Sequence, residues 1–156
     1  MEIRKAIFQD VEGIKELLLQ VLNIHAKHRP DLFIPNTTKY TDLELMELMS
    51  NPKTPIFVAV EEDKVIGYAF CILQQRLHSN NMTDILTLFI DDLCVEESRR
   101  GEHIGEQIYQ YVENYAKEIG CYHITLNVWE FNKDAYAFYE KIGLQPMETV
   151  MEKILK

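Results

Sequence analysis

The sequence has few cysteines, no long apolar run and little positive charge. Its 156 residues include three cysteines, Cys71, Cys94 and Cys121, which lie far apart among apolar neighbours. This pattern argues against a disulfide framework or a cysteine metal site, so we expect reduced core cysteines in a cytoplasmic protein. No apolar run approaches the ~20 residues of a membrane span. The charged start, MEIRKAIFQD, lacks the apolar core of a secretory signal, so we expect no membrane partner.

Acidic residues outnumber basic ones, which gives a formal net charge of −9 at pH 7. A nucleic-acid-binding protein uses surplus lysine and arginine to neutralise phosphates, so we do not expect nucleic acid as a partner. Most of this charge favours solubility, but an acidic surface also attracts cationic small molecules.

Two common phosphate-binding fingerprints are also missing. No glycine-rich loop is followed by Gly-Lys-Ser/Thr, and the dinucleotide pattern G-x-G-x-x-G is absent, which disfavours nucleotide-binding domains of these kinds. The chain has no repeat, low-complexity tract or Gly/Ser linker, so we expect one domain over residues 1–156.

Helical spacing of apolar residues predicts four helices. The first begins after Asp10, a good N-cap, and ends before Pro30. The second covers TDLELMELMSNP with Thr41 as its cap, and the third begins at Ile104. A short fourth helix, NKDAYAFYEKIG, is capped by Asn132.

Runs rich in β-branched and aromatic residues predict the strands. In chain order these are EIRKAIF, PIFVAV, VIGYAFCIL, ILTLFIDDLCV, HITLNV and a last strand in PMETVMEKIL. The element order β-α-α-β-β-β-α-β-α-β predicts an α/β (α+β) fold, with a mixed, mostly antiparallel central sheet flanked by about four helices.

The segment VEESRRGEHIG joins the fourth of these strands to the third helix through a glycine-containing turn. A helix N-terminus has unpaired N–H groups and a partial positive charge, so it binds anions without needing lysine. Gly101 and Gly105 would let the backbone approach a phosphate, and Arg99 or Arg100 would add charge-assisted hydrogen bonds. By itself, such a turn is also common before helices that bind no anion.

Together with the later segment NKDAYAFYEKIGL, this turn resembles the GNAT N-acetyltransferase superfamily. The turn is similar to the family's acetyl-CoA motif, Arg/Gln-x-x-Gly-x-Gly/Ala, which is RGEHIG here. The later segment is similar to the signature N-x-x-A-x-x-F-Y-E-K-x-G-F, with Leu144 in place of the last phenylalanine. The matching residues are Asn132, Ala135, Phe138, Tyr139, Glu140, Lys141 and Gly143. The element order also fits, so the resemblance covers nearly the whole chain.

The resemblance implies acetyl-CoA as co-substrate and no metal. The backbone of Leu93, Cys94 and Val95 would pair with its pantetheine arm. Backbone N–H groups of the loop and helix start would bind its pyrophosphate, from Arg100, Gly101, Glu102, His103, Ile104, Gly105 and Glu106. Asn132 would reach the pantetheine or its thioester end, on a cofactor-binding segment that includes Ala135, Phe138 and Lys141.

The implied reaction is direct attack of a neutral amine on the thioester in a ternary complex, which needs proton removal, an oxyanion donor and an acid for the thiolate. Tyr139 matches the family's acid, and Asp91 and Asp92 match the acidic pair of polyamine acetyltransferases. Adjacent strand residues face opposite sides, so we expect only one carboxylate in the cleft, Asp91 by that alignment. A structural hydrogen bond is the alternative role. Asn127 replaces the glutamate base of the ribosomal-protein acetyltransferases, which disfavours that subclass.

His103 stands where the family has its first glycine. Because α-helical φ is accessible to histidine, we expect ordinary helix-start geometry at this position. The side chain would then face solvent or, when protonated, add charge near the phosphates.

The family's acceptor pocket lies near the first two helices and their connecting loop. His25 and His28 on the first helix, with Trp129 and Glu130 after the fifth strand, are therefore the candidate acceptor-binding residues. The two histidines have no evident third partner for a metal, so packed or solvated roles are the expectation.

Two functions are consistent with these motifs. The first is a cytoplasmic, acetyl-CoA-dependent N-acetyltransferase that acts on a primary amine of a small, cationic acceptor. Its last apolar strand offers an edge for pairing in a homodimer. The alternative is a catalytically silent CoA-binding regulatory or interaction module, against which Tyr139, Asn132 and the acidic pair argue.

Overall fold

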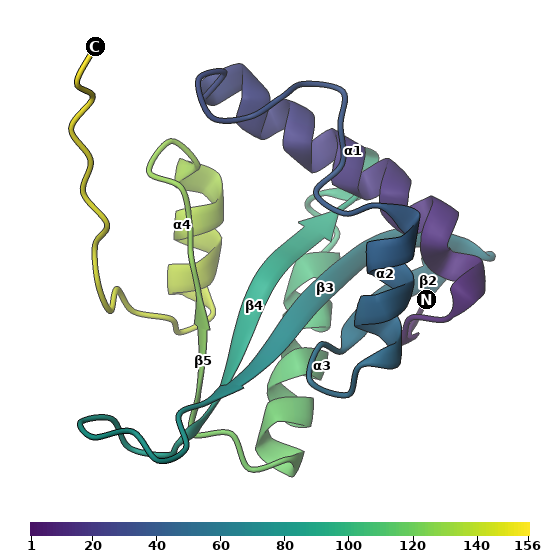
Figure 1. Ribbon diagram of the computed structural model, residues 1–156. Coiled ribbons are helices and arrows are strands. Elements are labelled where there is room, and N and C mark those ends of the chain that lie inside the picture. The colour runs from purple at the N-terminus through teal and green to yellow at the C-terminus, as the bar shows by residue number, and fades with distance from the viewer.

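The computed structural model describes residues 1–156 as a single five-stranded sheet flanked by helices (Figure 1). The sheet order is β1-β2-β3-β4-β5, antiparallel up to β4 and parallel between β4 and β5. The strands are β1 (Glu2–Lys5), β2 (Ile56–Glu61), β3 (Lys64–Gln75), β4 (Leu86–Val95) and β5 (His123–Leu126). The helices are α1 (Val11–His28), α2 (Asp42–Ser50), α3 (Ile104–Glu118) and α4 (Lys133–Lys141). The predicted fold class is therefore confirmed.

The predicted side-chain caps form at α2 and α4 but not at α1. The Thr41 hydroxyl accepts the Glu44 N–H at 3.2 Å and caps α2, as predicted. The buried Asp10 makes no such bond to α1. Its carboxylate instead accepts the N–H of Ile7 at 2.8 Å and the Arg4 guanidinium at 2.7 Å, which ties β1 to the start of α1.

Two apolar layers cover the sheet, with α1 and α2 on one face and α3 on the other (Figure 1). Side chains alternate between these layers along β2 and β3, as expected for strands buried on both faces. The α3 layer contains Phe57, Ala59, Ile66, Ala69, Leu88, Ile104, Ile108 and Val112. The layer under α1 and α2 contains Ile14, Leu17, Leu18, Leu45, Val58, Tyr68 and Phe70. No helix is both long enough and apolar enough to span a membrane.

The predicted last strand is wrong. Residues 144–156 have no regular secondary structure and run away from the sheet, in yellow in Figure 1. A strand needs a hydrogen-bonded neighbour, and no backbone–backbone hydrogen bond involves residues 145–156. The apolar pattern that predicted the strand is present but exposed, at Met147, Val150, Met151, Ile154 and Leu155.

Candidate active site

A β-bulge in β4 positions the acidic pair. Phe70 pairs with Asp92 and Cys71 with Ile90, so Asp91 is an extra residue on β4. An extra residue interrupts the alternation of side chains along a strand. Both carboxylates therefore lie on the α1/α2 face, where Asp92 accepts a hydrogen bond from the Tyr68 hydroxyl at 2.7 Å. This corrects the prediction that only one of the pair would face the cleft.

The two carboxylates differ in their surroundings. Asp91 accepts the Tyr40 hydroxyl at 2.5 Å and pairs with the Lys39 ammonium at 3.0 Å, both through Oδ2. Its Oδ1 atom makes no hydrogen bond within the protein. Asp92 has no cation at contact distance, and burial raises its pKa to about 6. Nothing in the local sequence pattern places Lys39, Tyr40 or Tyr68 beside β4, so none of the three was predicted.

The edge of β4 that follows the bulge is open. Pairing between β4 and β5 ends at Ile90 and Leu126, although β4 continues to Val95. The two strands diverge from that point (Figure 1). The backbone groups of the predicted pantetheine-binding residues Leu93, Cys94 and Val95 therefore face no neighbouring strand on this side.

A run of free backbone N–H groups follows β4. None of the N–H groups from Gly101 to Glu106 makes a hydrogen bond, and the first bond of α3 runs from Gln107 to the carbonyl of His103. The positive end of the α3 dipole lies at the same place. This arrangement fits a pyrophosphate, as the sequence predicts.

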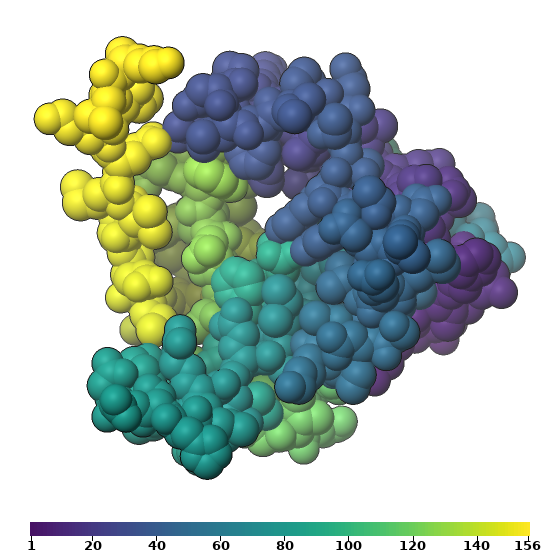
Figure 2. Space-filling view, in the orientation of Figure 1, coloured from purple at the N-terminus to yellow at the C-terminus, as the bar shows by residue number.

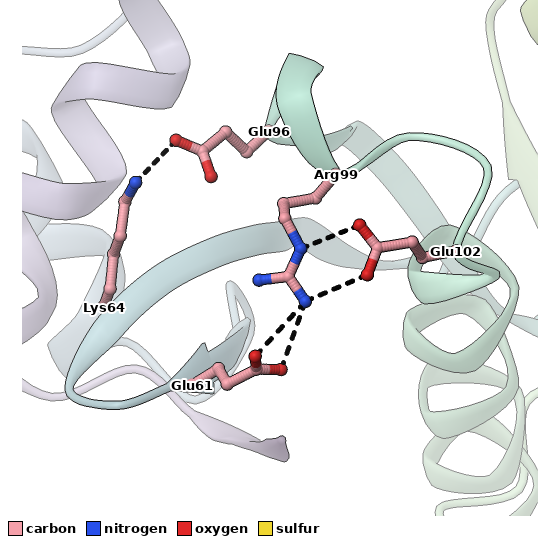
Figure 3. Close-up of polar contacts among 5 residues, drawn as sticks. All are labelled: Glu61, Lys64, Glu96, Arg99 and Glu102. Atoms are coloured by element: carbon pink, nitrogen blue, oxygen red, sulfur yellow. Dashed lines mark hydrogen bonds and ion pairs between the residues drawn. The ribbon is translucent and has the colours of Figure 1, made fainter.

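Ion pairs fix the loop in front of α3 (Figure 3). Arg99 lies between Glu61 and Glu102, with its Nε atom 2.8 Å from the Glu102 carboxylate, and Lys64 pairs with Glu96 at 2.7 Å. Arg99 is thus already engaged within the protein. Arg100 is exposed and makes no ion pair, so it is the arginine available to an anionic ligand.

The backbone at His103 differs from the prediction. His103 precedes α3 with φ 63° and ψ 19°, in the left-handed region, and not with helical φ. Glycine adopts this region without strain, whereas other residues are disfavoured there by contacts of Cβ with the backbone. The structure therefore explains why a glycine suits this position. The imidazole is exposed and lies 3.4 Å from Glu106.

α4 and its N-cap position two polar candidates of the signature, Asn132 and Tyr139. The Asn132 side-chain oxygen accepts the N–H of Ala135 at 3.2 Å and caps α4, which leaves its amide NH2 group free. The Tyr139 hydroxyl makes no hydrogen bond and is not among the fully buried polar atoms, so it opens onto the cleft. Burial of the ring and the nearby charge of Asp92 raise the pKa of Tyr139, which keeps the hydroxyl protonated.

One open cleft of about 3450 Å³ connects these features. Figure 2 shows part of it as the gap between α4, in green, and the helices and loop in blue. It is lined by Asp91, Asp92, Leu93, Cys94, Val95, Arg100, Gly101, His103, Ile104, Gly105, Glu106, Asn132, Ala135, Phe138, Tyr139 and Lys141. Glu102 is the exception among the predicted cofactor-binding residues, because its side chain is turned to Arg99.

The predicted acceptor-binding residues separate into two groups. His25 and Trp129 line the cleft together with Phe33, and their rings pack within 6.3 Å of one another. Burial lowers the pKa of His25, and the Lys39 charge adds to this effect. His28 is outside the cleft and stacks on Phe131 at 4.5 Å. The Glu130 side chain borders the cleft but is 97% exposed and pairs with Lys133.

Comparison with known proteins identifies the class to which this fold and site belong. The sequence profile of the Acetyltransferase (GNAT) family matches residues 19–144, which is most of the chain. The protein therefore belongs to the GNAT acetyltransferase family. The predicted family is confirmed.

Two curated relatives are similar over part of their length. The chain is 31% identical over 64 residues to the glucosamine 6-phosphate N-acetyltransferase of Arabidopsis thaliana, which covers 41% of each protein. It is 32% identical over 60 residues to the thialysine N-epsilon-acetyltransferase of Bos taurus, covering 38% of this chain and 35% of that protein. The aligned part thus spans 35–41% of the length of these relatives.

Solved structures match over the whole chain. A mutant of the BH1408 protein from Bacillus halodurans has a TM-score of 0.95 and 34% identity, covering 100% of both chains. The Arabidopsis thaliana glucosamine-6-phosphate N-acetyltransferase has a TM-score of 0.72 and 25% identity, covering 99% of this chain and 98% of that one. The aminoglycoside N-acetyltransferase AAC(6')-Iy, in complex with CoA, has a TM-score of 0.71 at 16% identity over 99% of each chain, which shows the fold alone.

Proposed function

We propose that this protein transfers an acetyl group from acetyl-CoA to a primary amine of a small, cationic acceptor, in a ternary complex. The observation that carries the proposal is the single cleft that joins four features. These are the free N–H groups at the start of α3, the open edge of β4, the carboxylates of Asp91 and Asp92, and the hydroxyl of Tyr139.

The residues present fit CoA. The N–H groups from Gly101 to Glu106 would hold its pyrophosphate with Arg100, and the open edge from Leu93 to Val95 would pair with its pantetheine arm. The free amide NH2 group of Asn132 would donate to the same arm. Acetyl-CoA supplies an activated thioester carbonyl at the end of this path.

Side chains of the protein would then accept a proton from the amine and donate a proton to the leaving thiolate. The acidic pair attracts the acceptor's ammonium group, and Oδ1 of Asp91 is free to accept a proton from it. Tyr139 stays protonated because its pKa is raised, and it would protonate the departing sulfur. Asp92 has a pKa of about 6, so it would be ionised at alkaline pH, where an amine loses its proton most easily.

The acceptor class follows from charge. The carboxylates of Asp91 and Asp92 face the proposed amine site, and the chain's net charge is −9, so a cation is favoured over an anion. The names of the two curated relatives describe amine acceptors, glucosamine 6-phosphate and thialysine, and support a primary amine as the acetylated group.

The test has two stages. A thermal-shift series with CoA, ATP and NAD should show stabilisation by CoA alone, since a ligand of the native state raises stability by RT ln(1 + [L]/Kd). Thiol release from acetyl-CoA is then followed across a panel of polyamines, amino sugars, amino acids and aminoglycosides. Absence of a CoA shift at saturation would refute the proposal. A CoA shift without thiol release for any amine would favour the silent CoA-binding module.

We also propose a homodimer formed through the C-terminal segment. Residues 145–156 carry exposed apolar side chains, and Glu152 forms an ion pair with Arg29 at 2.8 Å. β5 leaves one edge of the sheet unpaired. An exposed segment with apolar side chains can pair with the open sheet edge of a second copy. Light scattering of the full chain should give a dimer, and removal of residues 145–156 should give a monomer. A full-length monomer would rule the dimer out.

A further inference from the structure

The ammonium group of Lys39 already lies where the proposed mechanism places an acceptor amine. Its Nζ atom is 3.0 Å from Oδ2 of Asp91, the carboxylate that borders the open edge of β4. The Asp91 side chain is only 15% exposed, whereas that of Lys39 is 44% exposed. The lysine therefore reaches a shielded carboxylate from the open side of the cleft, and both residues line it.

The loop holds Lys39 at this place. The next residue, Tyr40, stacks on Phe70 at 5.4 Å and donates its hydroxyl to the same Asp91 oxygen. On the other side, the Thr38 hydroxyl donates to the Tyr40 carbonyl at 2.9 Å. The backbone at Lys39 is thus fixed by its neighbours, while four methylene groups leave the amine free to advance toward the thioester.

The charge of Lys39 acts on both halves of the cleft. Its charge lowers the pKa of Asp92 on one side, against the effect of burial, and that of His25 on the other. His25 belongs to the aromatic wall formed with Phe33 and Trp129. Lys39 therefore contacts the acidic pair at Asp91 and lies close enough to this wall for its charge to act on His25.

We propose that Lys39 is an internal acceptor, which fills the amine site in the absence of substrate and is itself acetylated by bound acetyl-CoA. This inference rests on the proposed function. It assigns a modification site in the loop before α2, and it makes an external amine a competitor of Lys39 for the Asp91 carboxylate.

The step balances without another reactant. The Lys39 ammonium gives one proton to Asp91, and Nζ forms a bond to the carbonyl carbon as the C–S bond breaks. Tyr139 gives its proton to the departing thiolate and regains one from the new amide nitrogen through solvent, while Asp91 releases its proton to solvent. The products are acetylated Lys39, CoA thiol and one proton.

Peptide mapping by mass spectrometry tests the inference on the full chain. The protein is incubated with acetyl-CoA that carries a deuterated acetyl group, without an amine, and the label on each lysine is followed over time. Lys27 is the reference, because it is exposed, makes no ion pair and lies outside the cleft. Lys39 should be labelled at least about tenfold faster than Lys27, because a positioned amine has a high effective concentration.

Two variants and one competitor complete the test. Asp91→Asn should slow labelling of Lys39 to the rate of Lys27, and Tyr139→Phe should slow it without unfolding the protein. An amine that the enzyme acetylates should suppress labelling of Lys39 and leave Lys27 unchanged. Thiol release with an external amine, but equal labelling of Lys39 and Lys27, would overturn this inference and leave the proposed function standing. No CoA binding and no thiol release would overturn both.

Discussion

Residues 10–116 and residues 117–156 are built in different ways. All of the buried residues lie between Asp10 and Ala116, in the layers on the two faces of the sheet. No residue after Ala116 is buried, yet this open region carries Asn132 and Tyr139. We call residues 10–116 the closed region and residues 117–156 the open region. The closed region sets the geometry of the acidic pair and of the α3 N-terminus. The open region presents groups whose contacts a ligand or a second copy would complete.

This difference has a consequence for dynamics. Local opening is easiest where few apolar contacts are buried, and ligand-binding elements are drawn from that part of a structure. The open region should therefore depend on CoA and on dimerisation for its order, and the closed region should not. Four experiments with substituted proteins test this distinction, beginning with the largest expected effect.

Removal of one hydroxyl from the open region should affect the chemistry strongly and stability little. Tyr139→Phe should lower kcat by about 10²–10⁴, the usual contribution of a general acid. The free energy of unfolding should hardly change, because the hydroxyl makes no hydrogen bond. Steady-state thiol release and thermal unfolding measure the two effects. The control is Tyr122→Phe at an exposed tyrosine, and equal kcat values in both variants would refute the acid role.

Truncation of apolar side chains should separate the two regions by stability. Ile108 is 0% exposed in the α3 layer, so Ile108→Ala should lower the free energy of unfolding by about 2–5 kcal/mol. Phe138 on α4 is only half-buried, and Phe138→Ala should cost about 1–2 kcal/mol without ligand. Urea denaturation of both variants measures the difference, and equal losses would contradict the distinction between the regions.

The charge of Asp92 should destabilise the closed region at high pH. Its folded pKa of about 6 lies above the unfolded value of 3.8, so the folded state holds the proton more tightly. The penalty is absent below pH 4, grows as the pH rises from 4 to 6, and then levels off at about 2–3 kcal/mol. Asp92→Asn should therefore raise stability at pH 8 but not at pH 4, as measured by urea denaturation at both values. Equal effects at the two pH values would contradict a raised pKa.

The smallest effect concerns His103, which precedes α3 in the closed region. At His103 the φ angle of 63° strains any residue with a Cβ atom. His103→Gly should therefore be about 1 kcal/mol more stable than His103→Ala, although both remove the imidazole. The order would be reversed if the residue adopted helical φ, because alanine is then the better residue.

Much of the fold could be predicted because its signals are local. The caps at Thr41 and Asn132 formed as expected, and so did the strands with alternating or continuous apolar residues. The acidic pair was found, but its orientation was wrong, because a bulge depends on how β4 pairs with β3 and not on the composition of β4. The apolar segment after Leu144 has the composition of a strand but no neighbour within the chain.

The sequence by itself determined the types and order of the elements before Leu144 and the two family motifs, since these depend on capping, periodicity and turn residues within short segments. Only the tertiary structure decided which groups meet. It turned Asp91 and Asp92 to one face of the sheet and separated the end of β4 from β5. It also brought Lys39 and Tyr40 into contact with Asp91, which is 51 residues after Tyr40 in the sequence. The physical reason is that strand register and loop packing join distant segments, and no local propensity specifies which residues those contacts bring together.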